Sequence, residues 1–461
     1  MQIKNKKIIL VEPAGAQANV FSKFMKLPLM GPLYLGTILN QAGHDVKIYN
    51  ENILSRSVKD EELQGDILCL TILTPSASNG YKIAKRFKKL NPNSKVIIGG
   101  VHATFLKEEA IKYADQVVVG EGEEVILDMI NGNITDQFVY GGKEQNINNI
   151  PSPNFNLLEK KEKMNIYPMI TSRGCPFDCD FCSVTQMFGR QYRTNSIDRV
   201  IDDFKKLSGK RVFIYDDNFS AYIKRSHELM DRILSEGINL KWSAQVRVDV
   251  AKDEKLVAKM NKAGCKRVYV GFESVNPKTL ENFNKKQSVA DIERSIKVFH
   301  DNNIRIHGMF IFGSDADDKS VFKPTLDFCN KNKIDTVQYS ALTPLPGSYI
   351  YNRLNKEKRL LHQDWKYYDG IHAVFQPKQM SAYELQKGII DTYQDFYSYI
   401  MASKDALEAS VDFIGNLFHL SANKVSDLKF NRTMFKFVGN AIVKRWMKLN
   451  KKYMEYLAHI K

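Results

Sequence analysis

Three cysteines, Cys175, Cys179 and Cys182, stand within eight positions of the chain in the spacing C-x3-C-x2-C. They follow a strand-like run and Gly174, so they are expected to share one loop. Three soft thiolates this close can hold three irons of a [4Fe–4S] cluster and leave the fourth iron without a protein ligand. Such an open iron can chelate the amino and carboxylate groups of an amino-acid cofactor, and an electron delivered there can break a sulfonium C–S bond.

Two other uses of these thiols stay open at this point. A structural zinc site wants four protein ligands, and the remaining cysteines, Cys69, Cys265 and Cys329, are isolated in other strand or helix contexts. We expect those three to be ordinary buried thiols. A redox C-x-x-C pair would leave Cys175 unexplained. The spacing therefore favours a cluster.

From Tyr167 onward the chain alternates strand-like runs with helical stretches such as Ile197–Leu207 and Ser226–Glu236. The six runs are YPMITS, RVFIYDD, LKWSAQVRV, RVYVGFES, RIHGMFIFG and TVQYSALTP. Six parallel strands fit a partial (β/α)6 barrel of the TIM type, whose chemistry gathers at the carboxyl ends of the strands. After about Tyr383 the pattern is mostly helical.

Polar residues stand at three of these strand ends. They are Asp216, Asp217 and Asn218 after the second strand, Gln245 and Arg247 after the third, and Glu273 after the fourth. Each has a structural alternative, because an Asp-Asp-Asn run can form a turn and a glutamate can cap a helix or join a buried ion pair. Their succession behind the cysteine loop favours a ligand site.

The first 150 residues alternate in the same way, with strand-like runs KKIILVEP, DVKIYNE, DILCLTIL, KVIIGG and QVVVGEG. Alternation of strands and helices predicts an α/β domain of the Rossmann-like, flavodoxin-like type, with ligands outside the carboxyl ends of its strands. The Pro- and Asn-rich run NINNIPSPNF reads as a linker. We expect one domain over residues 1–150, a linker over 151–165, the barrel over 166–382 and a helical, basic region over 383–461.

Residues 166–380 resemble the core of the radical S-adenosylmethionine (SAM) superfamily, whose members carry C-x3-C-x2-C after the first barrel strand. The resemblance implies that the three cysteines hold the cluster and that Phe181 flanks the adenine. It also implies that Asp216 and Asp217, with Asn218, bind the cofactor's amino group, where the family usually has Gly-Gly-Glu. Gln245, Arg247 and Glu273 fall where the family contacts carboxylate and ribose.

The N-terminal region resembles the cobalamin-binding domain of B12-dependent radical enzymes. The matching pieces are the loop Glu12–Gln17, the run Thr71–Ala77 with Thr74, the run Ile97–Thr104 with Gly99, Gly100 and His102, and the run Gly120–Glu124 with Glu121 and Gly122. The two glycines of IIGGVHAT would let a nucleotide tail approach the backbone.

One departure from that domain matters. Domains that ligate cobalt from below use Asp-x-His-x-x-Gly in the loop after the first strand, whereas this loop reads EPAGAQAN. His102 could touch the cofactor or bond to backbone, and His44 is expected at the surface. The resemblance therefore implies cobalamin without a lower histidine ligand.

The formal charge of +15 is concentrated near the C-terminal end, where residues 429–461 hold nine Lys or Arg against one acid, Glu455. Aromatic residues are interleaved with these bases, namely Phe430, Phe435, Phe437, Trp446, Tyr453 and Tyr456. Such a pattern fits a solvated helix docked on the enzyme, or a peripheral contact with an anionic membrane. No apolar run approaches the ~20 residues of a membrane span, and the N-terminal apolar run is too short for a signal peptide. A cytoplasmic protein is expected, and peripheral association with a membrane stays open.

Together these features predict an enzyme that cleaves SAM reductively and, with cobalamin, methylates an unactivated carbon of a small-molecule or lipid-like substrate. A reductant such as flavodoxin or ferredoxin would supply the electron. The alternatives are an oxidoreductase or cyclase that uses both cofactors without methyl transfer, and a non-catalytic sensor. Nucleic-acid modification is not expected, since no separate RNA-binding module is present.

Overall fold

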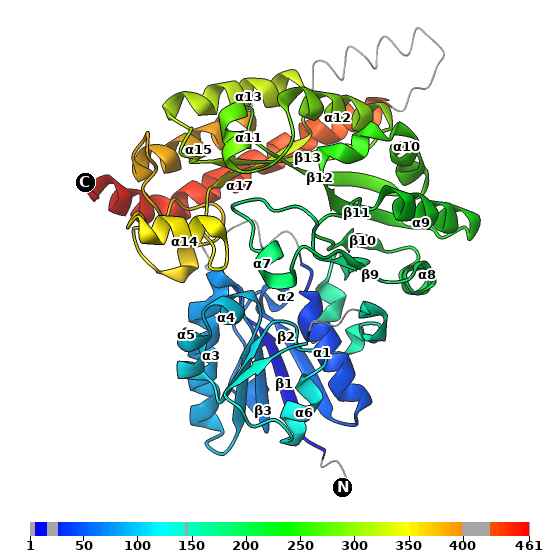
Figure 1. The fold of residues 1–461 in the computed structure, drawn as a ribbon, viewed down its shortest axis with the longest axis vertical. Coiled ribbons are helices and arrows are strands. Elements are labelled where there is room, and N and C mark those ends of the chain that lie inside the picture. Colours follow the sequence, from blue (N-terminus) through cyan, green and yellow to red (C-terminus); the bar gives the residue numbers. More distant parts are fainter. Residues whose placement is uncertain (1–4, 16–25, 143–145, 399–424, 461) are drawn as a thin grey trace.

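The computed structural model describes residues 5–15, 26–142, 146–398 and 425–460. Two six-stranded sheets lie end to end, the N-terminal sheet below and the barrel sheet above in Figure 1. The part of the loop Glu12–Gln17 beyond Gly15, and the side chains of Phe430, Phe435 and Phe437, lie outside the described residues. Within the described ranges, no helix has the length and apolar character needed to cross a bilayer.

The N-terminal sheet has the order β2-β1-β3-β4-β5-β6, and every neighbouring pair is parallel. Its first five strands follow the flavodoxin-like order, so the expected fold class is confirmed. The three-residue β6 was not expected from the sequence. The strands are β1 (Lys7–Glu12), β2 (Asp45–Asn50), β3 (Ile67–Thr71), β4 (Lys95–Gly99), β5 (Gln116–Val119) and β6 (Phe138–Tyr140).

Helices cover both faces of this sheet, which explains why its inner strands are continuous apolar runs. In β1 every residue after Lys7 is buried. The helices are α1 (Met30–Gln41), α2 (Glu51–Leu54), α3 (Ala77–Leu90), α4 (Val101–Phe105), α5 (Lys107–Ala110) and α6 (Ile126–Asn131).

The second sheet contains the six strands expected from the sequence, all parallel, in the order β14-β13-β12-β11-β10-β7. They are β7 (Tyr167–Met169), β10 (Arg211–Ile214), β11 (Lys241–Val246), β12 (Cys265–Glu273), β13 (Arg305–Phe312) and β14 (Thr336–Ala341). A two-residue antiparallel pair, β8 (Ser172–Arg173) and β9 (Arg193–Thr194), brackets the cysteine loop. In the described part of the chain, no pairing joins β14 to β7, so the barrel is open.

Helices follow the barrel strands and surround the sheet (Figure 1). They are α7 (Val184–Phe188), α8 (Ile197–Lys206), α9 (Ile223–Ser235), α10 (Glu254–Lys262), α11 (Pro277–Asn282), α12 (Val289–Asp301), α13 (Phe322–Lys331) and α14 (Tyr349–Lys356). Two longer helices complete the chain, α15 (Ala382–Phe396) and α17 (Val425–His459).

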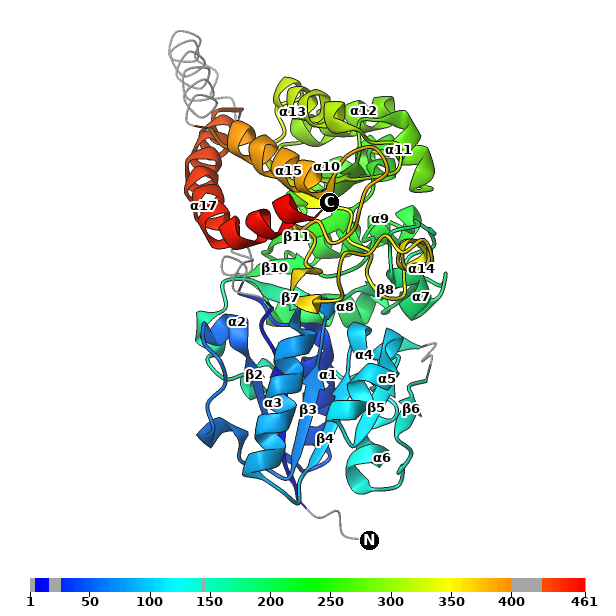
Figure 2. The same ribbon diagram turned by 90° about the vertical axis from the view of Figure 1, so that its left-hand side faces the viewer.

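Helix α15 and the residue after it protect the free edge of β14. The hydroxyl of Tyr393 accepts a hydrogen bond from the backbone N–H of Tyr339 at 2.8 Å, and the hydroxyl of Tyr397 accepts one from Val337 at 3.1 Å. These bonds satisfy edge donors that would otherwise be open to pairing with another strand. Helix α17 packs on α15 along the outside of the molecule (Figure 2).

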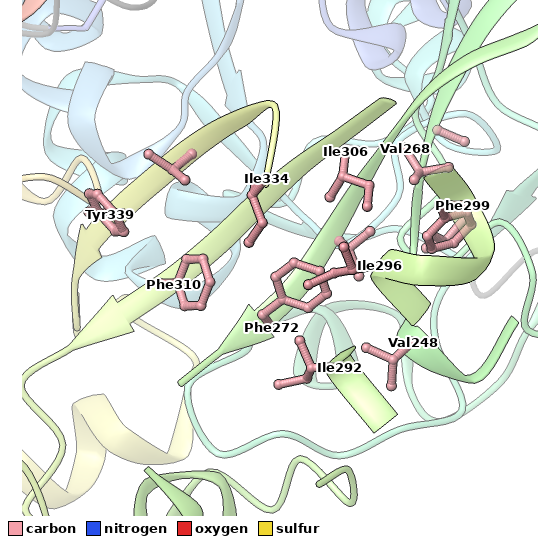
Figure 3. Packing of buried hydrophobic residues seen from close by; sticks show 14 of the residues in the cluster. Val248, Val268, Phe272, Ile292, Ile296, Phe299, Ile306, Phe310, Ile334 and Tyr339 are labelled. Atoms are coloured by element: carbon pink, nitrogen blue, oxygen red, sulfur yellow. The ribbon is translucent and has the colours of Figure 1, made fainter. Parts of the chain in front are cut away.

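The barrel core lies between the strands and the outer helices. Figure 3 shows Phe299 and Ile296 of α12 packed against Val268 and Phe272 of β12. All four side chains are nearly inaccessible to solvent. The isolated cysteines, Cys69, Cys265 and Cys329, are buried, as expected.

The segment expected as a linker packs on the N-terminal sheet. Leu158 is 3% exposed and forms a parallel bridge with Ile48 of β2. The N–H of Glu159 donates to the carbonyl of Ile48 at 2.9 Å. The connection therefore holds the two sheets in a fixed relation rather than running free between them.

Replacing Phe299 by Ala should lower the free energy of unfolding by about 3–5 kcal/mol, because it removes a buried aromatic ring and leaves a cavity. Leu234→Ala on α9, where the side chain is 40% exposed, is the matched control and should change it by about 0.5 kcal/mol or less. Denaturant unfolding followed by circular dichroism measures both. Equal losses for the two variants would contradict the core assignment.

Candidate active site

The cysteine loop opens into a cavity at the carboxyl ends of the barrel strands. Cys175, Cys179 and Cys182 all line this cavity, which has a volume of about 350 Å³. Gly174 begins the loop with φ +84°, and a Cβ there would lie 2.3 Å from the carbonyl oxygen of Gln191. Only glycine fits that turn without displacing backbone. The sequence GCPFDCDFC therefore folds so that all three thiols reach one space.

The three thiols are soft ligands, a type that both iron–sulfur clusters and zinc accept. Among the described residues, no group of three or more His, Cys, Asp or Glu is arranged to hold one metal ion. A zinc ion needs its ligands at about 2.0–2.3 Å from one point, whereas a cubane cluster offers a separate iron to each thiolate. Burial raises the pKa of Cys182 to about 12. A bound metal would displace that proton.

Five of the residues expected to bind SAM also line this first cavity. They are Phe181, Asp217, Gln245, Arg247 and Glu273, and Asn218, expected beside Asp217, is a sixth. They come from the cysteine loop and from the ends of β10, β11 and β12, which the parallel sheet brings to one rim. The structure thus places these side chains and the three thiols around one space.

Glu273 is held in an uncommon backbone conformation. The β12–β13 register shifts between Gly271 and Glu273, and Glu273 has φ +62°. Its carboxylate accepts a hydrogen bond from the Lys285 ammonium at 2.6 Å, and both side chains are 7% exposed. A bulge re-aims a side chain at a strand end, so the backbone and the ion pair together fix this carboxylate in the cavity wall.

Arg247 is fixed by three contacts. Its guanidinium lies 3.7 Å from the centre of the Phe177 ring, donates to the carbonyl of Lys285 at 2.7 Å and pairs with Asp249 at 3.0 Å. Sequence reasoning missed Phe177 and Lys285. Phe177 could have been found inside the cysteine run, but Lys285 comes from the turn after α11 and carries no local signal.

Asp216 does not line the cavity, which corrects the expectation that it binds the cofactor. Its side chain is fully buried and accepts four hydrogen bonds. The donors are the backbone N–H and the hydroxyl of Thr171 and of Ser172, at 2.5–3.0 Å. The carboxylate is therefore committed to holding the segment that leads into the cysteine loop.

A second cavity, of about 260 Å³, lies between the N-terminal sheet and the barrel. Of the residues expected to contact cobalamin, Gly100, Glu121 and Gly122 line it. The other walls are largely apolar. They include Leu29, Met30, Leu73, Met187, Phe188 and Tyr215.

Three residues expected at this cavity lie away from it. His102 is fully buried. Its Nδ1 lies 3.4 Å from the Thr74 hydroxyl and its Nε2 lies 3.4 Å from the Glu109 carboxylate, so His102 and Thr74 contact each other in the interior. Gly99 is also absent from the lining, and a Cβ there would meet Val118 at an ordinary 3.5 Å. His44, expected at the surface, is 3% exposed.

Gly100 is needed for a different reason from the one expected. It has φ +97°, and a Cβ there would lie 2.6 Å from the carbonyl oxygen of Ile72. The close approach is to the chain's own backbone, so a side chain here would distort β3 and β4 before it reached a ligand.

A buried ion network joins the two domains beside the second cavity. Arg173 pairs with Glu121 and, at 2.6 Å, with Glu123, and Arg193 pairs with Glu121 at 2.6 Å. These side chains are 6–9% exposed. The glutamates follow β5 and the arginines belong to β8 and β9, so the network ties the GEGEE loop to the base of the cysteine loop.

The two cavities share one residue, Asp217, which lines both. One carboxylate oxygen accepts a hydrogen bond from the N–H of Gly174 at 3.0 Å. Burial raises the pKa of Asp217 to about 6. The space beside the thiols and the space beside the N-terminal sheet thus meet at this side chain.

Replacing Asp216 by Ala should lower the free energy of unfolding by about 3 kcal/mol or more, because it leaves four buried donors without an acceptor. Iron retained after anaerobic reconstitution should fall as well, since the segment before Gly174 loses its anchor. Asp231→Ala on α9, where the carboxylate is 56% exposed, is the control. Unchanged stability in Asp216→Ala would contradict this role.

Glu121→Gln should lower the free energy of unfolding by about 3–5 kcal/mol, because two buried guanidinium groups lose their shared counter-charge. Glu61→Gln removes an exposed pair with Lys59 and should change the free energy of unfolding far less, because water and salt screen an exposed pair. Thermal and denaturant unfolding of both variants gives the comparison. Similar values for the two would show that the network contributes nothing beyond a surface pair.

Comparison with known families agrees with this architecture. The model of the radical SAM superfamily matches residues 169–329, and the model of the B12 binding domain matches residues 24–129. An uncharacterized methyltransferase of Pyrococcus horikoshii is 30% identical over 432 residues, covering 86% of this chain and 93% of that protein. The bacteriochlorophyllide d C-12(1)-methyltransferase of Chlorobaculum tepidum is 29% identical over 413 residues, covering 86% of this chain and 88% of that protein.

A solved structure has the same arrangement of domains. The cobalamin-dependent SAM radical enzyme OxsB, with aqua-cobalamin and SAM bound, matches with a TM-score of 0.68 over 99% of this chain and 80% of that one. The identity is 15%, so this likeness concerns the fold alone. With the relative from Pyrococcus horikoshii similar over most of both lengths, the chain belongs to the radical SAM superfamily, in the branch that carries an N-terminal B12 binding domain.

Proposed function

We propose that this protein is a cobalamin-dependent radical SAM methyltransferase that acts on an unactivated carbon of a small or lipid-like substrate. The observation that carries the proposal is the shared wall at Asp217, which lines the cavity of the three thiols and the cavity above the N-terminal sheet. A methyl donor and a hydrogen-abstracting group must reach the same substrate carbon, and adjoining cavities allow that. The methyltransferase names of two relatives support the same activity.

The residues would divide between three cofactors. Cys175, Cys179 and Cys182 would hold the [4Fe–4S] cluster. SAM would contact Phe181, Asp217, Gln245, Arg247 and Glu273, and cobalamin would contact Gly100, Glu121 and Gly122. Cobalamin would bind without a lower histidine ligand, because the loop after β1 lacks the Asp-x-His-x-x-Gly motif.

When bound, the reduced cluster supplies the electron that cleaves SAM, and methylcobalamin supplies the methyl group. The protein contributes charge and shape. Burial raises the pKa of the Cys179 thiol, and the nearby charges of Lys285 and Arg247 act in the opposite direction. Phe177, Phe181 and Leu342 are apolar parts of the first cavity wall and exclude water from it.

Three further parts of the proposal extend beyond the site. The domains would span residues 1–150, 166–382 and 383–461, with a linker over 151–165 whose Leu158 bridges to Ile48 of β2. A flavodoxin or ferredoxin would deliver the electron. The protein would work in the cytoplasm.

Anaerobic reconstitution with iron and sulfide tests the cluster assignment. The Cys175→Ala/Cys179→Ala/Cys182→Ala variant should lose both the paramagnetic signal of the reduced cluster and the formation of 5′-deoxyadenosine from SAM. The control variant, Cys69→Ala/Cys265→Ala/Cys329→Ala, should keep both if it folds, and Cys69→Ala alone serves if it does not. The proposal would be refuted if the unmodified protein held zinc in place of iron, or if the first variant still formed 5′-deoxyadenosine. Cleavage of SAM by the unmodified protein would exclude a non-catalytic sensor.

Isotope labelling tests methyl transfer. With SAM deuterated in its methyl group and a membrane lipid extract as substrate pool, the proposal expects a product that carries the labelled methyl group. The expected mass gain corresponds to one CH2 unit with the label. A product that loses hydrogen without gaining the label would identify an oxidoreductase or cyclase and contradict methyl transfer.

A further inference from the structure

The outer face of α17 exposes apolar side chains in one narrow strip. Val438, Leu449 and Tyr456 are 47%, 45% and 42% exposed. Their separations of eleven and seven residues correspond to about three and two turns, so they lie on one side of the helix. A helix with apolar side chains on its solvent side and basic side chains beside them can lie in a membrane interface.

Basic side chains cover the rest of that face. Arg445, Lys448, Lys451 and Lys452 are exposed, and Glu455 is the one acidic residue between 438 and 460. Arg445 and Lys452 stand three or four residues from Leu449 and so lie beside the apolar strip. The face is therefore amphipathic and strongly positive.

A groove on the other side of the basic residues adds a second apolar region. It has a volume of about 510 Å³ and lies between α15 and α17. Tyr383, Ile390, Met447 and Met454 contribute apolar walls, with Lys448 and Lys451 at the same groove. The basic band thus runs between an apolar strip and an apolar groove. Helix α17, which carries the band, lies along the outer edge of the molecule in Figure 2.

The inner face of the same helix packs against the segment that closes the first cavity. Tyr453 is 4% exposed, and its hydroxyl donates to the carbonyl of Ala373 at 2.8 Å. His372 is fully buried and hydrogen-bonds to Asn450 of α17 and, at 2.9 Å, to Asp369. Gly370, between these partners, lines the cavity of the thiols. A ligand on the outer face would therefore lie one helix away from the active-site wall.

We propose that the outer face of α17 docks on an anionic lipid bilayer, with the strip of Val438, Leu449 and Tyr456 in the headgroup region and the basic side chains on lipid phosphates. Charge complementarity selects an anionic partner, and the exposed aliphatic residues distinguish a bilayer from a nucleic acid. Docking would serve the uptake of a lipid-like substrate, and this role rests on the proposed function. Docking itself can be measured without turnover.

Sedimentation of the full-length protein with vesicles tests the proposal. Vesicles of phosphatidylcholine containing phosphatidylglycerol should bind the protein, and pure phosphatidylcholine vesicles should bind it at least about tenfold more weakly. Arg445→Glu/Lys448→Glu/Lys452→Glu should reduce binding to the anionic vesicles by about tenfold or more. Leu449→Ser/Tyr456→Ser should weaken binding to the anionic vesicles, and that binding should still fall as the salt concentration rises.

A matched variant controls for total charge. Lys224→Glu/Lys255→Glu/Lys262→Glu reverses three exposed lysines on α9 and α10 and should leave vesicle binding within about twofold. If the triple variant of α17 does not fold, Lys452→Glu alone and the Leu449/Tyr456 variant carry the test. Equal binding to both kinds of vesicle, equal loss in the α9–α10 control, or a change only in oligomeric state would overturn the proposal, whatever the outcome for methyl transfer.

Discussion

The ion network of Glu121, Glu123, Arg173 and Arg193 connects the loop after β5 to the β8–β9 pair that brackets the cysteines. Its charges are almost fully removed from solvent. Separation of the two domains would therefore expose these charges to water or leave them buried without their partners. Arg173 also immediately precedes Gly174, where the chain turns into the cysteine loop. The relation between the two cavities, and therefore any chemistry that uses both, depends on this contact.

Three carboxylates near the cysteine loop have different structural roles. The Asp216 carboxylate accepts four hydrogen bonds and fixes the backbone of Thr171 and Ser172. Asp217, the next residue, has a single hydrogen bond from Gly174 and reaches both cavities. Glu273 is fixed by Lys285 and by a bulge in β12. Asp216 and Asp217, which follow the end of β10, thus have different roles although they are neighbours in the sequence.

The sequence was sufficient for the two sheets because each strand is a short apolar run between helical stretches, and a parallel sheet covered on both faces produces that pattern. It was also sufficient for the thiols, whose spacing is local. It failed where partners come from distant segments. Asp216 is bound by residues of another strand end, and Lys285 reaches Glu273 from a turn. His102 and Thr74 stand beside glycines that resemble a ligand loop, yet they hydrogen-bond in the interior. The short β6 carried too few residues for a pattern.

The central claim is that the cluster and cobalamin occupy adjoining cavities that meet at Asp217. Electron paramagnetic resonance of the reconstituted protein, with the reduced cluster and cob(II)alamin present together, tests it most directly. The account predicts a magnetic interaction between the two centres, seen as faster relaxation or splitting of the cob(II)alamin signal relative to protein that holds cobalamin alone. Spectra that are the plain sum of two isolated centres, or cobalamin that fails to bind, would contradict it.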